Sequence, residues 1–251
     1  MKRILSFLLA AAMTFSLAAC SQGETSEISA PSDSGPYETE SDAGISAEEV
    51  RLEGPGSEAE GSGTGEGSGT GNILVAYFSW ADNAVLAEDV DAVSSPSVVP
   101  PGNVQQLAGW VQEETGGDLF SIRVTDPYSS DWDACLERAN EERGADARPE
   151  LMENVENLDQ YDTVFLGYPN WWYGVPMPLL TFLEENDLSG KQVYLFCSHG
   201  TGGLAESVEL ITEAVPDAVI SENIFDCYEE EASSSQEEIQ DWAGEIAAGA
   251  Q

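Results

Sequence analysis

The sequence predicts an α/β domain built on an open, doubly wound parallel sheet of five strands, with helices on both faces. Two features of the chain predict this fold class. Short, uninterrupted apolar runs are typical of strands that are buried on both faces of a sheet. Segments with helical apolar spacing separate these runs, so strand and helix alternate along the chain. Because crossovers between parallel strands are right-handed, the helices are expected to cover both faces.

The first half of this domain contains two expected strands and two expected helices. Residues 73–78, Ile-Leu-Val-Ala-Tyr-Phe, are apolar throughout and form the first strand. A helix is expected at 103–115, where the apolar residues recur at helical spacing and two glycines end the pattern. The second strand is expected at 118–124, and a helix with alternating charges at 131–143.

The second half repeats the alternation of strand and helix. Its first helix tolerates Pro178 because this residue lies in the first turn, where the missing N–H costs no hydrogen bond. The expected strands are 161–168, 192–197 and 218–225, and the helices that follow them are 177–185, 202–214 and 236–246.

The N-terminus has the features of a signal peptide. Lys2 and Arg3 precede an apolar run at 4–17, which is shorter than the roughly 20 residues that a membrane-spanning helix needs. The run ends in Leu-Ala-Ala followed by Cys20, which resembles the lipobox of bacterial lipoproteins. Residues 1–20 are therefore expected to direct export and lipidation of Cys20, which would anchor the protein to the outer face of the cell membrane. The alternative is ordinary secretory cleavage before Cys20.

The segment between the lipobox and the first strand is expected to be a disordered tether. Residues 21–71 are rich in Ser, Glu, Gly and Pro and contain almost no aliphatic side chains. Such a segment cannot bury enough apolar surface to offset the entropy lost on ordering. Residues 72–251 then form the single folded domain.

The charge of the chain excludes some partners. The sequence has 47 Asp and Glu against 8 Lys and Arg, a formal net charge of −39. This charge repels nucleic acids and anionic membrane surfaces, so contact with the membrane is expected only through the lipid anchor. A protein partner is expected to present a basic surface.

The cysteines and the single histidine predict neither a disulfide framework nor a metal site. Three thiols remain after lipidation, and no Cys/His spacing is typical of a metal site. His199 cannot form such a site without carboxylates. The expected role of the three thiols is structural burial: Cys135, Cys197 and Cys227.

Three loops that follow strands have an unusual composition. The first strand is followed by Ser79-Trp80 and, after an excursion, by Gly102-Asn103-Val104. The third strand leads into Tyr-Pro-Asn-Trp-Trp-Tyr-Gly at 168–174, and the fourth into Ser-His-Gly-Thr-Gly-Gly at 198–203. In open parallel sheets, ligands bind at the carboxyl ends of the strands. Glycine-rich loops and helix N-termini bind phosphate, and aromatic side chains cover flat rings, so the expected ligand is flavin mononucleotide (FMN).

Residues 73–246 resemble the flavodoxin family. The resemblance depends on Tyr-Phe-Ser at 77–79, Gly-Asn at 102–103, Gly-Tyr-Pro-Asn-Trp-Trp at 167–172 and Cys-Ser-His-Gly-Thr-Gly at 197–202. It implies a flavodoxin-like sheet with strand order 2-1-3-4-5 and non-covalent FMN, with the phosphate on the first loop and the ring between the other two. The cofactor-binding residues that it implies are Ser79, Trp80, Gly102, Asn103, Val104, Gln105, Pro169, Asn170, Trp171, Trp172, Tyr173, Ser198, His199, Gly200, Thr201 and Gly202.

The sequence departs from the family in two places. Members usually have Thr or Ser where this chain has Val104, so a hydroxyl that would reach the phosphate is missing. An acidic insert at 81–101 also splits the phosphate loop. An alternative alignment takes Asp82-Asn83 as the tight loop and starts the helix near Ala84. We favour the split loop, because the helix that begins at Asn103 has the required apolar period.

His199 and the two adjacent tryptophans of the aromatic loop are given specific roles. His199 is expected to act as a catalytic proton donor or hydrogen-bond partner at the flavin N1/O2 edge, and its alternative role is that of a turn residue. Adjacent residues of an extended loop face opposite ways, so of Trp171 and Trp172 one is expected to cover the ligand and the other the core.

Three classes of function follow. The first is an electron carrier with bound FMN, whose acidic surroundings predict a low reduction potential. The second is a flavin-dependent reductase that passes electrons from NAD(P)H to quinones or nitro compounds. The third is a lipoprotein that kept the fold and binds a ligand without any cofactor.

Overall fold

The structure, a computed structural model, describes residues 72–86, 95 and 97–249. The expected signal peptide, the lipidation of Cys20, the tether at 21–71 and residues 87–94 and 96 of the insert lie outside these residues. No helix in the described part of the chain combines the length and the apolar character needed to cross a bilayer.

The domain is built on a parallel sheet in the order β3-β1-β5-β6-β7, with β8 pairing the far end of β6. Every pairing in this sheet is parallel. With β7 and β8 counted as one broken strand, the order along the chain is 2-1-3-4-5, so the flavodoxin-like fold class is confirmed. The strands are β1 (Ile73–Tyr77), β3 (Asp118–Ser121), β5 (Thr163–Pro169), β6 (Gln192–His199), β7 (Val219–Ile220) and β8 (Phe225–Tyr228).

The fifth strand differs from the prediction of one strand at 218–225. The structure has β7 and β8 with four residues between them, and the ladder continues for three residues beyond the expected end. The Ser221 hydroxyl accepts a hydrogen bond from the Asn223 amide at 3.1 Å. This local turn competes with strand pairing, which is why the ladder is interrupted there.

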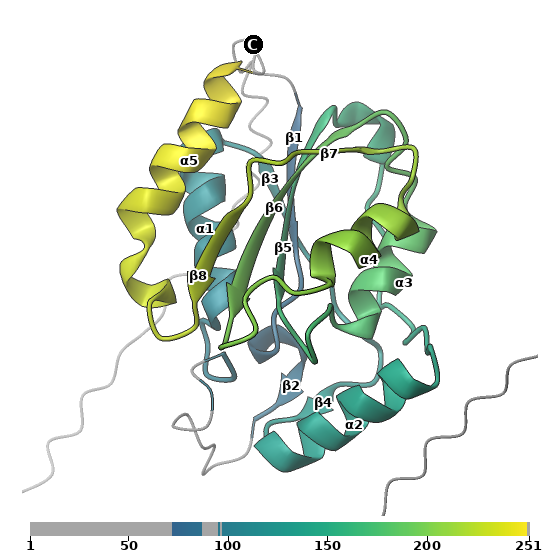
Figure 1. Cartoon of the computed structure of the whole chain (residues 1–251). Coiled ribbons are helices and arrows are strands. Elements are labelled where there is room, and N and C mark those ends of the chain that lie inside the picture. Colours follow the sequence, from purple (N-terminus) through teal and green to yellow (C-terminus); the bar gives the residue numbers. More distant parts are fainter. Residues whose placement is uncertain (1–71, 87–94, 96, 250–251) are drawn as a thin grey trace, which may run out of the picture. The chain divides into compact units, whose positions relative to one another are not determined.

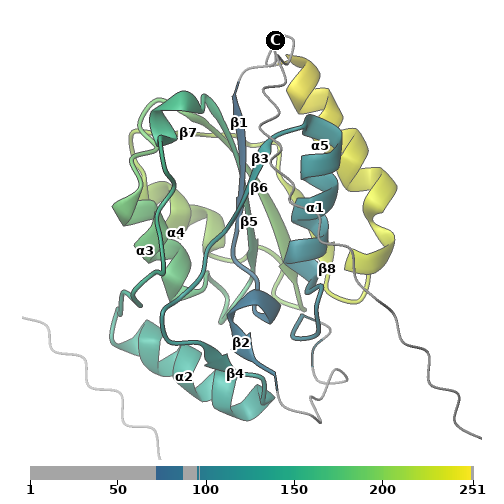
Figure 2. The same ribbon diagram turned by 180° about the vertical axis from the view of Figure 1, so that it is seen from behind.

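Helices cover both faces of the sheet, as predicted. Figures 1 and 2 show α1 and α5 on one face and α3 and α4 on the other, with α2 at the end of the sheet toward which the strand arrows point. Each face has its own buried apolar cluster. The helices are α1 (Asn103–Thr115), α2 (Trp132–Gly144), α3 (Met177–Glu185), α4 (Ser207–Ala214) and α5 (Gln236–Gly249).

Helix α4 starts later than predicted. The sequence predicts a helix from residue 202, but the structure has turns up to Glu206 and the helix begins at Ser207. Gly203 and Ala205 have φ values of +59° and +43°, which a right-handed helix does not allow. The glycine-rich turn after β6 is therefore longer than expected.

The split of the first loop is confirmed, and the alternative alignment is wrong. Residues Ala81–Asn83 form a short 3-10 helix, and Ala84–Val85 form strand β2, which pairs in parallel with β4 (Tyr128–Ser129). The buried Asn83 side chain explains this path: its Nδ2 donates to Ser79 O at 2.9 Å and to Ile122 O at 3.0 Å. Ala84 therefore begins a strand and not a helix, and α1 begins at Asn103 as predicted.

Candidate functional site

The loop after β1 and the start of α1 form a small polar cradle. Ser79 is buried, and its hydroxyl oxygen has no hydrogen-bond partner in the described residues. A Cβ atom at Gly102 would lie 2.7 Å from this oxygen and 2.5 Å from Ser97 O, so only glycine fits there. Buried hydroxyls are nearly always paired. The orphaned Ser79 hydroxyl therefore indicates that this cradle is shaped for a ligand atom.

The N-terminus of α1 supplies the rest of the cradle. Gly102 is the extended N-cap residue, and no side chain caps the helix. The first amides of a helix lack intrahelical partners and carry a partial positive charge, so the amides of Asn103, Val104 and Gln105 suit an anion. The Val104 side chain packs in the core beneath α1, which leaves only its amide for this purpose.

The structure gives Asn103 a different role from the predicted one. Its side-chain nitrogen donates to Glu229 O at 2.8 Å and to Ser198 Oγ at 3.3 Å. These bonds tie the start of α1 to the end of β6 and to the turn after β8. The Asn103 side chain therefore holds three segments of the sheet edge together.

An aromatic cavity of about 310 Å³ has Trp80, the residue that follows Ser79 in the chain, in its lining. It opens between the loops after β1, β5 and β6 and one side of α2. Eight of the sequence-predicted cofactor residues line it: Trp80, Asn170, Trp171, Trp172, Tyr173, Gly200, Thr201 and Gly202. The structure brings these predicted loops together at one edge of the sheet, and no charged side chain is among the described residues that line the cavity.

Helix α2 contributes a wall that the sequence analysis missed. The side chains of Trp132, Cys135, Leu136 and Ala139 complete the lining. Their spacing of i, i+3, i+4 and i+7 is an apolar stripe on an otherwise charged helix, and this stripe was the available signal. Burial raises the pKa of the Cys135 thiol to about 12, so this thiol lines the cavity as an apolar group.

The aromatic loop after β5 is held in a strained conformation. Trp171 packs edge-on against Phe78 and Tyr128, with ring centroids 5.5 and 5.4 Å apart, which is the core-facing role expected of one tryptophan. Trp172 and Tyr173 have φ values of +55° and +62°. For a non-glycine residue, this left-handed conformation costs about 1–2 kcal/mol of conformational free energy. Such strain is common at functional sites.

The indole nitrogen of Trp172 is a second orphaned polar group at this edge. It is buried and has no hydrogen-bond partner among the described residues, although its side chain lines the cavity. By contrast, Trp80 donates its indole hydrogen to Ser129 O at 3.0 Å. The neighbouring residue Tyr173 is largely exposed, at 62%. Trp172 therefore contributes to the lining of the cavity, while its indole nitrogen is buried and unpaired within the described residues.

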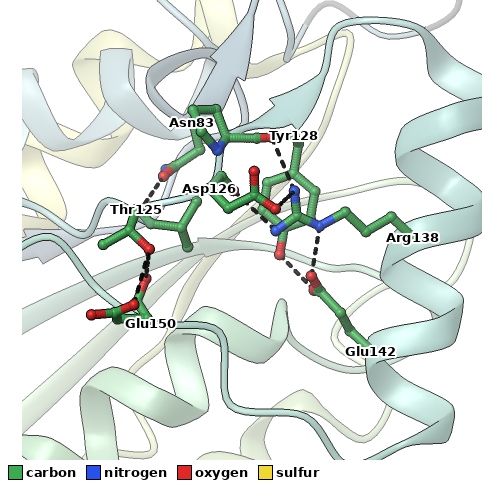
Figure 3. A network of polar contacts seen from close by, with 9 residues as sticks. Asn83, Thr125, Asp126, Tyr128, Arg138, Glu142 and Glu150 are labelled. Atoms are coloured by element: carbon green, nitrogen blue, oxygen red, sulfur yellow. Dashed lines mark hydrogen bonds and ion pairs between the residues drawn. The ribbon is translucent and has the colours of Figure 1, made fainter.

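A polar network on the far side of Tyr128 fixes the position of α2. Figure 3 shows Arg138 reaching from α2 toward Asp126, while its Nε donates to Glu142 at 2.8 Å. The Tyr128 hydroxyl donates to the same Glu142 carboxylate at 2.6 Å, and the Arg138 guanidinium lies 4.0 Å from the Tyr128 ring centre. Burial, with Glu142 beside it, raises the pKa of Tyr128 far above its usual value. The network thus positions both α2 and the ring against which Trp171 packs.

His199 does not line the cavity. Its Nδ1 lies 2.8 Å from Gly200 O, and its Nε2 lies 2.8 Å from the Asp226 carboxylate. Both ring nitrogens therefore face acceptors in the protein, an arrangement that fixes the turn at Gly200. Two other predicted cofactor residues are part of the sheet: Pro169 is the last residue of β5, and Ser198 pairs with it in β6.

A carboxylate lies close to the cradle. Glu229 is half-buried, accepts a hydrogen bond from Ser95 at 3.4 Å, and donates its amide to His199 O at 2.8 Å. Burial and the nearby Glu230 raise the pKa of the Glu229 carboxyl. Within the described residues, no group of three or more His, Cys, Asp or Glu side chains is placed to hold a metal ion.

Comparison with known proteins identifies the family. A family model described as Flavodoxin matches residues 92–246, and the chain belongs to the flavodoxin family. No curated protein sequence matches it. The matched region begins inside the insert, so β1 and Ser79 lie before it.

Solved structures with the same fold include two proteins from Bacteroides that are assigned as flavoproteins. The one from Bacteroides eggerthii is 27% identical and has a TM-score of 0.52; the match covers 70% of this chain and 98% of that one. The one from Bacteroides uniformis is 23% identical with a TM-score of 0.53, over 69% and 98% of the two chains. A flavoprotein from Lactobacillus acidophilus, crystallised in complex with FMN, is 15% identical over 66% and 98%, with a TM-score of 0.48.

Proposed function

We propose that this protein binds FMN and carries electrons at the outer face of the cell membrane. The observation that carries the proposal is the buried, unpaired Ser79 hydroxyl beside Gly102, next to an aromatic cavity. One polar cradle for a phosphate and one flat apolar cavity for a ring match the two ends of FMN. When bound, FMN supplies the redox chemistry, because its ring system accepts and releases electrons.

The cradle would hold the phosphate without any cation. Ser79 would donate its hydroxyl hydrogen to the phosphate, and the first amides of α1 would donate their N–H groups to it. The arginines and the lysine of the described region contact other groups, so the helix dipole supplies the positive potential. Asn103 keeps the start of α1 in place through its bond to Glu229 O.

The aromatic cavity would position the ring and exclude water. Trp171 and Trp80 would form the side toward the core, and Trp132 on α2, whose ring centre lies 5.9 Å from that of Trp80, would continue this wall. A volume of about 310 Å³ is at the lower end of the range for ligand sites, enough for one ring system. This size favours a carrier over a reductase, which must also hold a nicotinamide against the flavin.

The carrier role requires separate donor and acceptor proteins. One partner is oxidised as the bound flavin is reduced, and the electron then passes to the second partner without transfer of heavy atoms. The net charge of −39 favours partners with a basic contact surface. The signal-peptide features before Cys20 support lipid anchoring on the outer face of the membrane.

The absorbance of the purified, full-length protein tests this function. We expect flavin bands, one FMN released per chain on heating, and no oxidation of NAD(P)H when a quinone is added. Flavin absorbance bands together with rapid oxidation of NAD(P)H by the quinone would instead favour the reductase. A protein that has no flavin bands and takes up no added FMN would exclude both and favour a binding lipoprotein without cofactor.

A further inference from the structure

Arg143 contacts Trp172, a residue that lines the aromatic cavity. It lies in the last turn of α2, and its Nη1 donates to Trp172 O at 3.1 Å. Its guanidinium carbon lies 5.9 Å from the centre of the Trp172 ring, and this ring lines the cavity. Arg143 itself is outside the lining, so it would act on a ligand by holding Trp172 and through its charge, without touching the ligand.

No carboxylate of the described residues forms an ion pair with Arg143. Among the described residues, the other arginines each have an acidic partner within 4.0 Å: Arg123, Arg138 and Arg148. Lys191 is buried and donates to Tyr161 O at 2.6 Å. Arg143 thus keeps its positive charge available next to the cavity, in a chain with a net charge of −39.

The backbone carbonyl that Arg143 holds belongs to the strained part of the aromatic loop. Trp172 and Tyr173 both have positive φ values, and this turn needs external contacts to persist. Arg143 supplies one contact at Trp172 O, and the Glu206 amide supplies another at Tyr173 O, at 3.0 Å. Hydrogen bonds from a charged donor are stronger than neutral ones.

We propose that Arg143 is a positioning residue that raises the reduction potential of the flavin bound in this cavity. It holds Trp172 against the ring and places a positive charge behind it, and this charge stabilises the reduced ring, which carries more negative charge than the oxidised ring. The effect opposes that of the acidic surroundings, so the potential is less negative than net charge alone predicts. This inference rests on the proposed FMN binding.

The test compares three variants of the full-length protein with wild type. Arg143→Gln removes the charge, Arg143→Lys keeps it, and Arg123→Gln makes the same charge change at an exposed arginine that is paired with Glu153. The measurements are the midpoint potential of the bound flavin at two salt concentrations and the dissociation constants of oxidised and reduced FMN. Folding is checked by circular dichroism.

We expect Arg143→Gln to lower the potential and to raise the dissociation constant of reduced FMN relative to oxidised FMN about three- to tenfold. Arg143→Lys should keep the midpoint potential close to that of wild type. Arg123→Gln should change the ratio of the two dissociation constants, reduced over oxidised FMN, less than twofold. High salt should shrink the difference between Arg143→Gln and wild type.

Equal shifts in Arg143→Gln and Arg123→Gln would overturn the inference, because net charge alone would then explain them. A Lys variant that behaves like the Gln variant would also overturn it. A wild-type protein that binds no FMN would instead overturn the proposed function, and this inference with it. These outcomes are distinguishable, because the last is seen in wild type before any variant is compared.

Discussion

At the scale of single residues, Ser79 is the clearest mark of a ligand site. Its hydroxyl is buried and has no partner in the described part of the chain, whereas the buried Ser207 hydroxyl donates to Leu204 O at 2.6 Å and lies 3.0 Å from the Tyr168 hydroxyl. A hydroxyl that supports only the protein fold is normally paired. The two serines therefore allow ligand binding and stability to be tested separately.

Ser79→Ala should weaken FMN binding about 10- to 100-fold, because it removes a hydrogen bond to a charged phosphate. The free energy of unfolding without FMN should change by less than about 0.5 kcal/mol, since no protein bond is lost. Isothermal calorimetry and urea unfolding measure the two effects. Ser207→Ala is the control, and it should lose about 1–2 kcal/mol of stability with unchanged FMN affinity. The opposite pattern would show that Ser79 is structural.

His199 has two candidate roles, that of a proton donor to the flavin and that of a turn residue. Both of its ring nitrogens face acceptors, Gly200 O and the Asp226 carboxylate, and its side chain is not part of the cavity lining. This geometry favours the turn-forming alternative over a proton donor.

His199→Ala and Asp226→Asn should therefore weaken FMN binding to a similar extent, by about tenfold or less, because each releases the turn at Gly200. The slope of the midpoint potential against pH should stay that of wild type. If His199→Ala alone altered this slope and left the affinity intact, the histidine would be a proton donor to the flavin.

At the scale of elements, α1 is the helix that the cradle depends on. It contains or adjoins two glycines that face very different surroundings. A Cβ atom at Gly102 would meet Ser97 O, Ser79 Oγ and Ala81 Cβ within 3.0 Å, but one at Gly109 would meet nothing within 4 Å. The same substitution therefore has opposite expected effects at the two positions.

Gly102→Ala should lower the FMN affinity at least about tenfold and destabilise the protein by about 1–3 kcal/mol, because the added methyl group crowds the cradle. Gly109→Ala should stabilise the protein by about 0.5–1 kcal/mol through helix propensity and leave the affinity unchanged. Thermal unfolding with and without FMN measures both. Equal FMN affinity in the two variants would place the phosphate elsewhere.

The elements also show what the sequence could predict. Uninterrupted apolar runs located β1, β5 and β6, and the bounds of α1 and α3 were predicted to the residue. The broken fifth strand and the late start of α4 were missed, because they depend on a side-chain turn at Ser221 and on left-handed backbone at Gly203. Neither leaves a clear periodic signal.

At the scale of the whole molecule, the three loops of the site were predictable because parallel strands share one carboxyl edge. What the sequence could not predict is how side chains from distant segments meet there. The bond from Asn103 to Glu229 O joins residues 126 positions apart, and Asn83 bonds to Ile122 O across 39 positions. The position of α2 across this edge also depends on tertiary contacts, among them the bonds of Arg138.

The domain should lose stability in alkali. Burial raises the pKa of the Cys135 thiol to about 12 and that of Cys227 to about 11, from an unfolded value of 9.0. Because the folded pKa values are the higher ones, their contribution is complete below pH 9 and is lost as the pH rises toward 11 and 12. Unfolding in urea at fixed salt should show a loss of about 2–4 kcal/mol between pH 8 and 10.5. The Cys135→Ser/Cys227→Ser variant should show a smaller loss, and a flat profile in wild type would contradict this reasoning.

The central claim is that one phosphate cradle and one aromatic cavity together bind FMN. The most direct measurement is a titration of flavin-free, full-length protein with FMN and with riboflavin, followed by quenching of the fluorescence of the cavity tryptophans. Both ligands have the same ring, so only the contribution of the cradle separates them. We expect FMN to bind with one site per chain and riboflavin to bind at least about 100-fold more weakly, since it lacks the phosphate. Equal affinity for the two, or no quenching by FMN, would contradict the claim.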